Sequence, residues 1–312
     1  MLQLKGIKKQ YGSVTALDNI ELNIKKGEIF GITGQEDSGK TTLLQVAAGL
    51  IKPDAGAVYL DGKNISSYSR ESRIQIGYVP QHFQLYDKLK VREHLDFYAG
   101  FYPLEGIQKE RRIEGLLNQV HLEEMEDVYV EKLSQGMRRR LCVAQALLSN
   151  PQVLILDEPG NGLDAKARVE YRTLLKSLSQ KKKTILISFH MISDLPDFCT
   201  SVGILEKGKL VLTGNMDEIM QTMKQEQPLL IQLNGGEEQA IQVLKENPHV
   251  KRLTLSDAGI SVIFDGDSRE EEKLLHLLIE KGISVYGFHR MMESFENRYL
   301  DILSRQGGWH AD

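Results

Sequence analysis

Hydrophobic residues follow two different spacings along the first two thirds of the chain. Short, nearly unbroken apolar runs occur at 29–32, 153–156 and 184–188, which is typical of strands buried on both faces of a parallel sheet. Over 92–101 and 107–120 the apolar residues instead recur every three to four positions, which predicts helices. The pattern therefore predicts an α/β region with a mostly parallel sheet, an antiparallel β part near the N-terminus and a helical subdomain at about 85–150.

A second pattern begins after a helical stretch at 216–224. The predicted elements alternate in the order strand, helix, strand, strand, helix, strand, at 229–233, 237–246, 250–255, 260–265, 269–281 and 283–288, and a closing helix follows at 294–303. This order predicts a ferredoxin-like α+β domain, and it contains no recognisable catalytic constellation. We therefore expect two domains, at 1–222 and 223–312.

The first candidate site is a phosphate-binding loop. Residues 34–41 read GQEDSGKT and fit G-x-x-x-x-G-K-[ST], between a predicted strand and a predicted helix. Glycines allow the backbone N–H groups to approach phosphates, and the following helix contributes the positive end of its dipole. The nucleotide-binding residues that we expect here are Gly34, Ser38, Gly39, Lys40, Thr41 and Thr42.

Within this loop each polar side chain has an expected role. Lys40 reaches the β- and γ-phosphates, Thr41 ligates Mg²⁺, and Thr42 faces the α-phosphate. The alternative is a chance glycine turn before a core helix, which the flanking strand and helix disfavour.

The second candidate site follows the apolar run at 153–156. Asp157 and Glu158 come directly after this predicted strand, and ligands bind at the carboxyl ends of parallel strands. Asp157 is expected to hold Mg²⁺ through its water shell, and Glu158 to accept a proton from the attacking water. Taken alone, two adjacent acids after a strand would more often form a turn or a helix cap.

The pentad Leu133-Ser134-Gln135-Gly136-Met137 stands between these two motifs in the chain, and with them it resembles the ATP-binding-cassette (ABC) transporter ATPases over residues 1 to about 222. The resemblance implies that this signature faces the γ-phosphate of ATP held by the opposite subunit. Ser134 offers a hydroxyl and Gly136 permits close approach, at a helix N-terminus that attracts anions. Alone, the pentad would indicate only a capped helix.

Other positions match this family in order. Tyr11 resembles the aromatic residue that stacks on adenine, and Gln81 resembles the glutamine that contacts Mg²⁺ and the attacking water. Asp164 resembles the aspartate that crosses the dimer interface, and His190 the histidine that contacts the γ-phosphate. Each would more often be structural if it stood alone, so the prediction rests on their shared order.

The resemblance also implies cofactors and partners. It implies ATP and Mg²⁺ as ligands and a second ABC ATPase subunit, with a homodimer favoured. The segment 293–300, in the C-terminal domain, resembles ATPases of the drug-exporter branch, which pair with ABC-2 type membrane permeases. A groove near 83–91 is expected to receive the membrane subunit. The C-terminal domain is interpreted as regulatory or, equally, as a stabilising appendage.

The phosphate loop departs from the family pattern at its variable positions. Such transporters usually carry neutral residues where this chain has Glu36 and Asp37. Two carboxylates beside a polyphosphate repel it unless they point outward, so we expect weakened nucleotide affinity rather than lost chemistry.

Composition limits the possible functions. The 312 residues carry a net charge of -4, which argues against nucleic-acid binding. The basic runs at 138–140 and 181–183 are interpreted as solvated faces. Two cysteines without metal spacing fit a reducing compartment, and no apolar run reaches the 18 or so residues that span a bilayer. We therefore expect a location at the cytoplasmic face of the membrane, through a separate membrane subunit.

Two other functions compete with an exporter ATPase. A cassette protein of translation or DNA repair would commonly carry two cassettes or a long coiled-coil insertion, and the sequence shows neither. A non-transport regulatory ABC ATPase, or nucleotide sensor, would tolerate the altered phosphate loop but would not need Glu158.

Overall fold

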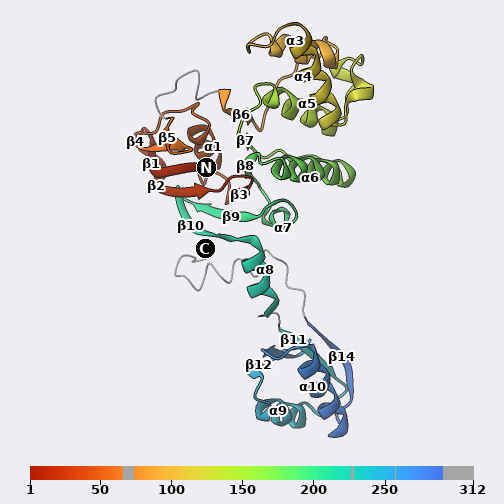
Figure 1. Ribbon diagram of the computed structural model, residues 1–312. Coiled ribbons are helices and arrows are strands. Elements are labelled where there is room, and N and C mark those ends of the chain that lie inside the picture. The colour runs from red at the N-terminus through yellow and green to blue at the C-terminus, as the bar shows by residue number, and fades with distance from the viewer. Residues whose placement is uncertain (66–73, 226–227, 257, 291–312) are drawn as a thin grey trace. The chain divides into compact units, whose positions relative to one another are not determined.

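The computed structural model describes residues 1–65, 74–225, 228–256 and 258–290. Within it the chain forms two compact units, Met1–Met216 and Asp217–Asp312 (Figure 1). The helix α8 (Met216–Gln225) begins at the boundary. Each unit has its own hydrophobic core, so the two are described separately.

The larger unit is organised around a six-stranded sheet with the order β10-β9-β3-β8-β7-β6. Four of its strands lie side by side and parallel, with β6 at the edge, namely β3 (Ile29–Thr33), β8 (Thr184–Ser188), β7 (Val153–Leu156) and β6 (Ile76–Val79). Every residue of β3, β7 and β8 is buried, as the apolar runs predicted. β9 (Ser201–Glu206) pairs parallel with β3 on its other side. β10 (Lys209–Asn215) pairs antiparallel with β9 and forms the other edge of the sheet.

A second, antiparallel sheet lies at the N-terminal part of this unit. Its order is β2-β1-β4-β5, formed by β1 (Leu2–Tyr11), β2 (Val14–Ile24), β4 (Ala55–Leu60) and β5 (Lys63–Asn64). Alternating residues of β1 and β2 enter a core shared with the helix α1 (Lys40–Ala47) and with one face of the six-stranded sheet. This shared core holds the start of α1 fixed against both sheets.

Three helices form the predicted helical subdomain between β6 and β7. They are α3 (Val91–Ala99), α4 (Gly106–Gln119) and α5 (Gln135–Leu147), with the short helices η1 (Glu123–Met125) and η2 (Val130–Lys132) between the last two. After β7 the long helix α6 (Ala165–Gln180) leads to β8, and η3 (Ile192–Asp194) and α7 (Leu195–Phe198) lead to β9. The mixed-sheet cassette architecture predicted from the sequence is confirmed.

The smaller unit contains a four-stranded antiparallel sheet of order β12-β13-β11-β14. The chain order is β11 (Leu229–Leu233), α9 (Glu237–Glu246), β12 (Val250–Ser256), β13 (Gly259–Phe264), α10 (Ser268–Glu280) and β14 (Val285–Arg290). This is the predicted alternation of strands and helices, and assignment to the ferredoxin-like class remains a proposal. The predicted helix at 294–303 and the family-like segment at 293–300 lie outside the described residues.

The interpretation of 138–140 as a solvated basic face is wrong for two of its three residues. Arg139 and Arg140 are only 6% and 7% exposed. The Arg140 guanidinium donates to the carbonyl oxygens of Val120 and His121 and forms an ion pair with Glu170 at 3.3 Å. These acceptors come from other segments of the chain, so sequence neighbours gave no sign of the burial.

Tyr171 offers a test of the packing of α6. Its side chain is 1% exposed, and among the described residues its hydroxyl has no hydrogen-bond partner. Tyr171→Phe removes this unsatisfied group without changing the ring, so we expect it to raise the free energy of unfolding by about 1 kcal/mol. Tyr171→Ala should lower it by about 3–5 kcal/mol through the cavity that it leaves. Denaturant unfolding measures both, and a loss of stability in Tyr171→Phe would show that the hydroxyl has a partner.

Candidate functional site

Three segments meet where the central parallel strands end. The phosphate loop follows β3, Asp157 and Glu158 follow β7, and His190 follows β8 by two residues. Because these strands are parallel neighbours, their carboxyl ends lie at one edge of the sheet. The sheet thereby brings together residues more than a hundred positions apart in the chain.

The backbone of the phosphate loop requires glycine at both of its ends. Gly34 has φ 155°, and a Cβ there would lie 2.0 Å from the Leu205 carbonyl oxygen. Gly39 has φ 103°, and its Cβ would lie 2.4 Å from the Ala16 carbonyl oxygen. Asp37 also adopts the left-handed region, at φ 60°, which aspartate tolerates better than most residues.

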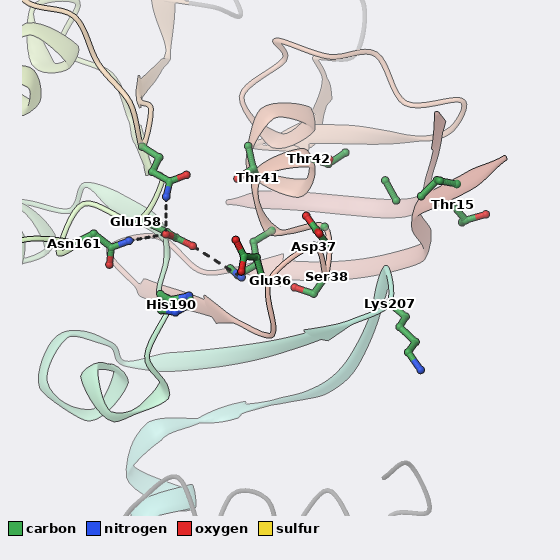
Figure 2. A pocket seen from close by; sticks show the side chains of 15 residues that line it. Thr15, Glu36, Asp37, Ser38, Thr41, Thr42, Glu158, Asn161, His190 and Lys207 are labelled. Atoms are coloured by element: carbon green, nitrogen blue, oxygen red, sulfur yellow. Dashed lines mark hydrogen bonds and ion pairs between the residues drawn. The ribbon is translucent and has the colours of Figure 1, made fainter. Parts of the chain in front are cut away.

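A cavity of about 790 Å³ lies over this loop (Figure 2). Most of the predicted phosphate and catalytic residues line it, together with residues from the β2 strand and from two loops. The lining consists of Val14, Thr15, Ala16, Glu36, Asp37, Ser38, Gly39, Lys40, Thr41, Thr42, Gln81, Glu158, Asn161, His190 and Lys207.

Lys40 is the buried cation of the cavity. Its ammonium donates to the carbonyl oxygens of Gly34 and Gln35 at 2.8 and 2.9 Å, and it lies 3.9 Å from Glu158 Oε1. Burial lowers the pKa of Lys40, and the charges of Glu158, Asp157 and both loop acids oppose that shift. The site therefore holds a desolvated cation, which favours an anionic ligand.

Asp157 is fixed by hydroxyl groups. The Ser188 hydroxyl donates to Asp157 Oδ1 at 2.7 Å and accepts from the Glu158 backbone N–H at 2.8 Å. The Tyr78 hydroxyl lies 3.5 Å from Asp157 Oδ2, and burial together with the Asp157 charge raises the pKa of Tyr78 to about 12. Tyr78 therefore stays protonated and can donate to this carboxylate.

Glu158 is held by two amide groups. The side-chain nitrogens of Gln81 and Asn161 donate to Glu158 Oε2 at 2.9 and 2.7 Å. Figure 2 shows the Asn161 contact as a dashed line. Its backbone has φ 43°, a strained value for a residue with a side chain. We call Gln81 and Asn161 the amide clamp.

The polar groups that line the cavity fit a polyphosphate. Ser38 is 4% exposed, and its hydroxyl has no partner among the described residues. A phosphate oxygen beside Ser38 would accept a hydrogen bond from this hydroxyl and so satisfy it. Glu36 and Asp37 are exposed and lie close enough to raise the pKa of Lys40, so they oppose the same ligand electrostatically.

Ser134 and Gly136 do not line this cavity. Ser134 is exposed and caps α5, accepting the Met137 backbone N–H at 3.2 Å. A Cβ on Gly136 would lie 2.8 Å from Ala167 Cβ, so packing against α6 already favours glycine there. The structure thus leaves the predicted role of both residues toward a partner subunit as a prediction.

Tyr11 is also outside the cavity lining. Its ring is 48% exposed and lies 5.4 Å from the Lys9 ammonium, and its stacking role stays a prediction. Five lining residues were missed in the sequence, namely Val14, Thr15 and Ala16 at the start of β2, Asn161 and Lys207. Asn161 lies three residues after Glu158, a spacing that could have drawn attention to it, whereas Lys207 comes from a turn with no local signal. In Figure 2 the Lys207 side chain points away from Glu158.

A glycine-bounded loop at the start of a helix, a buried lysine and a strand-end acid pair define a P-loop nucleotide-binding site. Residues 17–161 match the family model described as ABC transporter. The bacitracin transport ATP-binding protein of Bacillus licheniformis is 31% identical over 304 residues, 97% of each chain. The chain therefore belongs to the ABC transporter ATP-binding proteins. It is the ATP-binding subunit of a transporter, and it is an ATPase.

Other relatives cover the chain to different extents. The linearmycin resistance ATP-binding protein of Bacillus subtilis strain 168 is 27% identical over 98% of this chain and 99% of its own. A probable sulfate/thiosulfate import ATP-binding protein of Chlorella vulgaris is 37% identical over 69% of this chain and 92% of its own. Relatives named for antibiotic transport or resistance and a relative named for import thus both match, and the match to the import protein is limited to about two thirds of the chain.

Among solved structures, a dimeric ATP-binding cassette in a post-hydrolysis state, bound to ADP and Pi, matches with a TM-score of 0.62 and 30% identity. It covers 69% of this chain and 99% of that one. The likeness supports the cassette fold and the prediction of ATP as ligand.

The acidic loop residues give a direct test of the site. The double substitution Glu36→Asn with Asp37→Gly removes two carboxylates near the phosphates and relieves the positive φ of Asp37. We expect roughly tenfold tighter ATP binding, because two partly screened like charges are removed. Titration with a fluorescent ATP analogue measures the dissociation constant.

The matched control is Asp61→Gly. Asp61 is exposed, has φ 47° and does not line the cavity, so its replacement removes a charge and a strained φ elsewhere. Affinity should not change in this variant. Equal affinities of the native chain and the double variant would show that the loop acids point away from the nucleotide.

Proposed function

We propose that the chain energises export of an antibiotic or another amphipathic compound through a separate membrane subunit. The observation that carries this proposal is the extent of similarity: the bacitracin and linearmycin relatives match nearly the whole chain, including the smaller unit. The importer relative matches about the length of the cassette alone. Nod factor export proteins likewise match only about 70% of the chain, so the full-length matches favour the bacitracin and linearmycin relatives in particular.

The proposed roles rest on the cavity lining and, for Tyr11 and Asp157, on the family resemblance. Lys40, Ser38, Thr42 and the loop N–H groups hold the phosphates of ATP, and Tyr11 contacts the adenine. Thr41, Gln81 and Asp157 offer oxygen ligands of the kind that Mg²⁺ prefers. Bound Mg²⁺ would neutralise phosphate charge.

The hydrolytic residues lie opposite the phosphate loop. Glu158 accepts the proton of the attacking water, and the clamp residue Gln81 orients that carboxylate. His190 is exposed at the cavity wall, where it can contact the γ-phosphate. The Lys40 ammonium must leave the loop carbonyl oxygens and Glu158 when it turns to the phosphates.

A second ATPase subunit completes the proposed site. Ser134 and Gly136 lie outside the chain's own cavity, at the N-terminus of α5. In a dimer closed head to tail they contribute to the partner's ATP, where the helix end stabilises the γ-phosphate. A homodimer is the simplest such assembly.

An exposed aromatic patch, consisting of Tyr86, Phe97 and Phe101, marks the proposed docking surface for an ABC-2 type permease. These residues are 50%, 46% and 62% exposed, and Phe97 contacts Tyr86 and Phe101 edge to face, with ring centroids 5.2 and 5.5 Å apart. Contiguous exposed aromatic residues are typical of an interaction surface. Docking on the permease would hold the chain at the cytoplasmic membrane face. Among the helices that the structure describes, none has the length and hydropathy needed to cross a bilayer.

A nucleotide sensor without transport is the alternative function. The acidic phosphate loop is compatible with it. The arrangement around Glu158, in which two amides and a strained backbone hold one carboxylate, instead favours hydrolysis.

Co-purification tests the transporter proposal. The full chain purified from native membranes should bring a multispan membrane protein, and ATP hydrolysis by the complex should rise when an amphipathic peptide antibiotic such as bacitracin is added. Phe97→Ser with Phe101→Ser should abolish co-purification and leave ATP binding unchanged. Ile107→Ser, which removes another exposed apolar residue, is the matched control. Recovery of ribosomes or DNA, or retention of the membrane protein by the patch variant, would contradict the proposal.

The role of Glu158 is tested by Glu158→Gln. The amide cannot accept the proton, so hydrolysis should fall at least about a hundredfold, while ATP binding persists. Size-exclusion chromatography with ATP should then show a trapped dimer. A variant that hydrolyses ATP at the native rate would remove Glu158 from this role.

A further inference from the structure

Arg139 is a buried arginine whose position ordinary packing does not explain. It lies in α5, the helix that the signature pentad begins, and is 6% exposed. No ion pair joins it to a carboxylate among the described residues, and its Nε has no partner there. A buried guanidinium in such surroundings costs free energy that an apolar side chain of similar size would avoid.

Arg139 contacts two residues of the loop that follows β6. Its Nη1 donates to the backbone carbonyl oxygen of Gln81 at 3.1 Å, and its Cζ lies 4.7 Å from the centre of the Phe83 ring. One hydrogen bond and one cation–π contact thus tie the signature helix to two residues of this loop. Together they fix the backbone at position 81.

Gln81 is held through its backbone and acts through its side chain. While its carbonyl oxygen accepts from Arg139, its amide nitrogen donates to Glu158 Oε2 at 2.9 Å. Asn161 supplies the other half of the amide clamp, from the segment after β7, and has no described contact with Arg139. The carboxylate is therefore held by one amide that Arg139 anchors and by one that it does not.

We infer that Arg139 is a positioning residue for ATP hydrolysis: it fixes the backbone of Gln81 and thereby sets the orientation of Glu158. The inference rests on the proposed role of Glu158 as the base. General-base catalysis depends steeply on the placement of the base, so a small displacement of Gln81 slows the chemical step without weakening ATP binding.

The neighbouring Arg140 provides a matched control. It lies in the same helix with nearly the same exposure, 7%, but its contacts are Glu170 and the carbonyl oxygens of Val120 and His121. Arg140→Met therefore removes a buried arginine of equal size that does not touch the clamp. We expect it to lower the melting temperature and to leave kcat of the folded protein unchanged.

The experiment measures kcat, KM and the ATP dissociation constant of the full chain. Arg139→Met should lower kcat roughly tenfold, about the scale of one hydrogen bond, with KM and ATP affinity unchanged. Arg139→Lys keeps one donor and should restore part of the rate. Thermal melting confirms folding. If Arg139→Met does not fold, Arg139→Lys and Arg139→Gln replace it in every comparison.

Double variants separate positioning from a general structural effect. In a Gln81→Ala background, Arg139→Met should lower kcat no further. In an Asn161→Ala background, it should lower kcat by the same factor as in the otherwise native chain. An equal fall in both backgrounds, or a native kcat in Arg139→Met, would overturn the inference. Glu158→Gln tests the base separately: if it abolishes hydrolysis while Arg139→Met has no effect, only the positioning role fails.

Discussion

The parallel pairing of β3, β8 and β7 is the constraint on which the site depends. Each strand is fully buried, so packing on both faces sets its register. Because the strands are parallel, their three carboxyl ends lie at one edge of the sheet. The 2.7 Å hydrogen bond from Ser188 to Asp157 joins two of these ends directly. A slip of one residue in any of the strands would separate the acid pair from the phosphate loop, so the fold and the chemistry share one geometric requirement.

Electrostatic balance at that edge partly offsets the cost of burying Lys40. The Lys40 ammonium donates hydrogen bonds to two loop carbonyl oxygens and lies near the Glu158 carboxylate. These contacts partly compensate the desolvation cost of burying its charge. In the proposed complex, phosphate oxygens of ATP replace these contacts. Glu36 and Asp37 favour Lys40 as a cation, and in that complex they would repel the phosphates.

Much of the fold could be predicted from local pattern, because buried parallel strands and amphipathic helices each have a characteristic spacing. The bounds of β7, β8, β11 and α9 agree with the prediction to the residue. Burial of Arg139 could not be predicted, because a run of three arginines usually indicates a solvent-exposed surface. The hydrogen-bond acceptor that accompanies its burial, the Gln81 carbonyl oxygen, lies in a distant segment of the chain. The place of Lys207 in the cavity lining also depends on segments that are distant in the sequence. The contact of Asn161 with Glu158 depends on the direction of its side chain, which residue spacing does not specify.

In the proposed dimer each hydrolytic site is shared between two chains. Two inactive variants test it by complementation: Lys40→Met disables the phosphate loop, and Ser134→Asp keeps the cap of α5 while placing a negative charge before the partner's γ-phosphate. In a mixed dimer one site combines the intact loop of one chain with the intact signature of the other. We predict that mixing the two variants restores part of the native ATP hydrolysis. A mixture as inactive as its components would contradict the shared site and place both motifs at the ATP of a single chain.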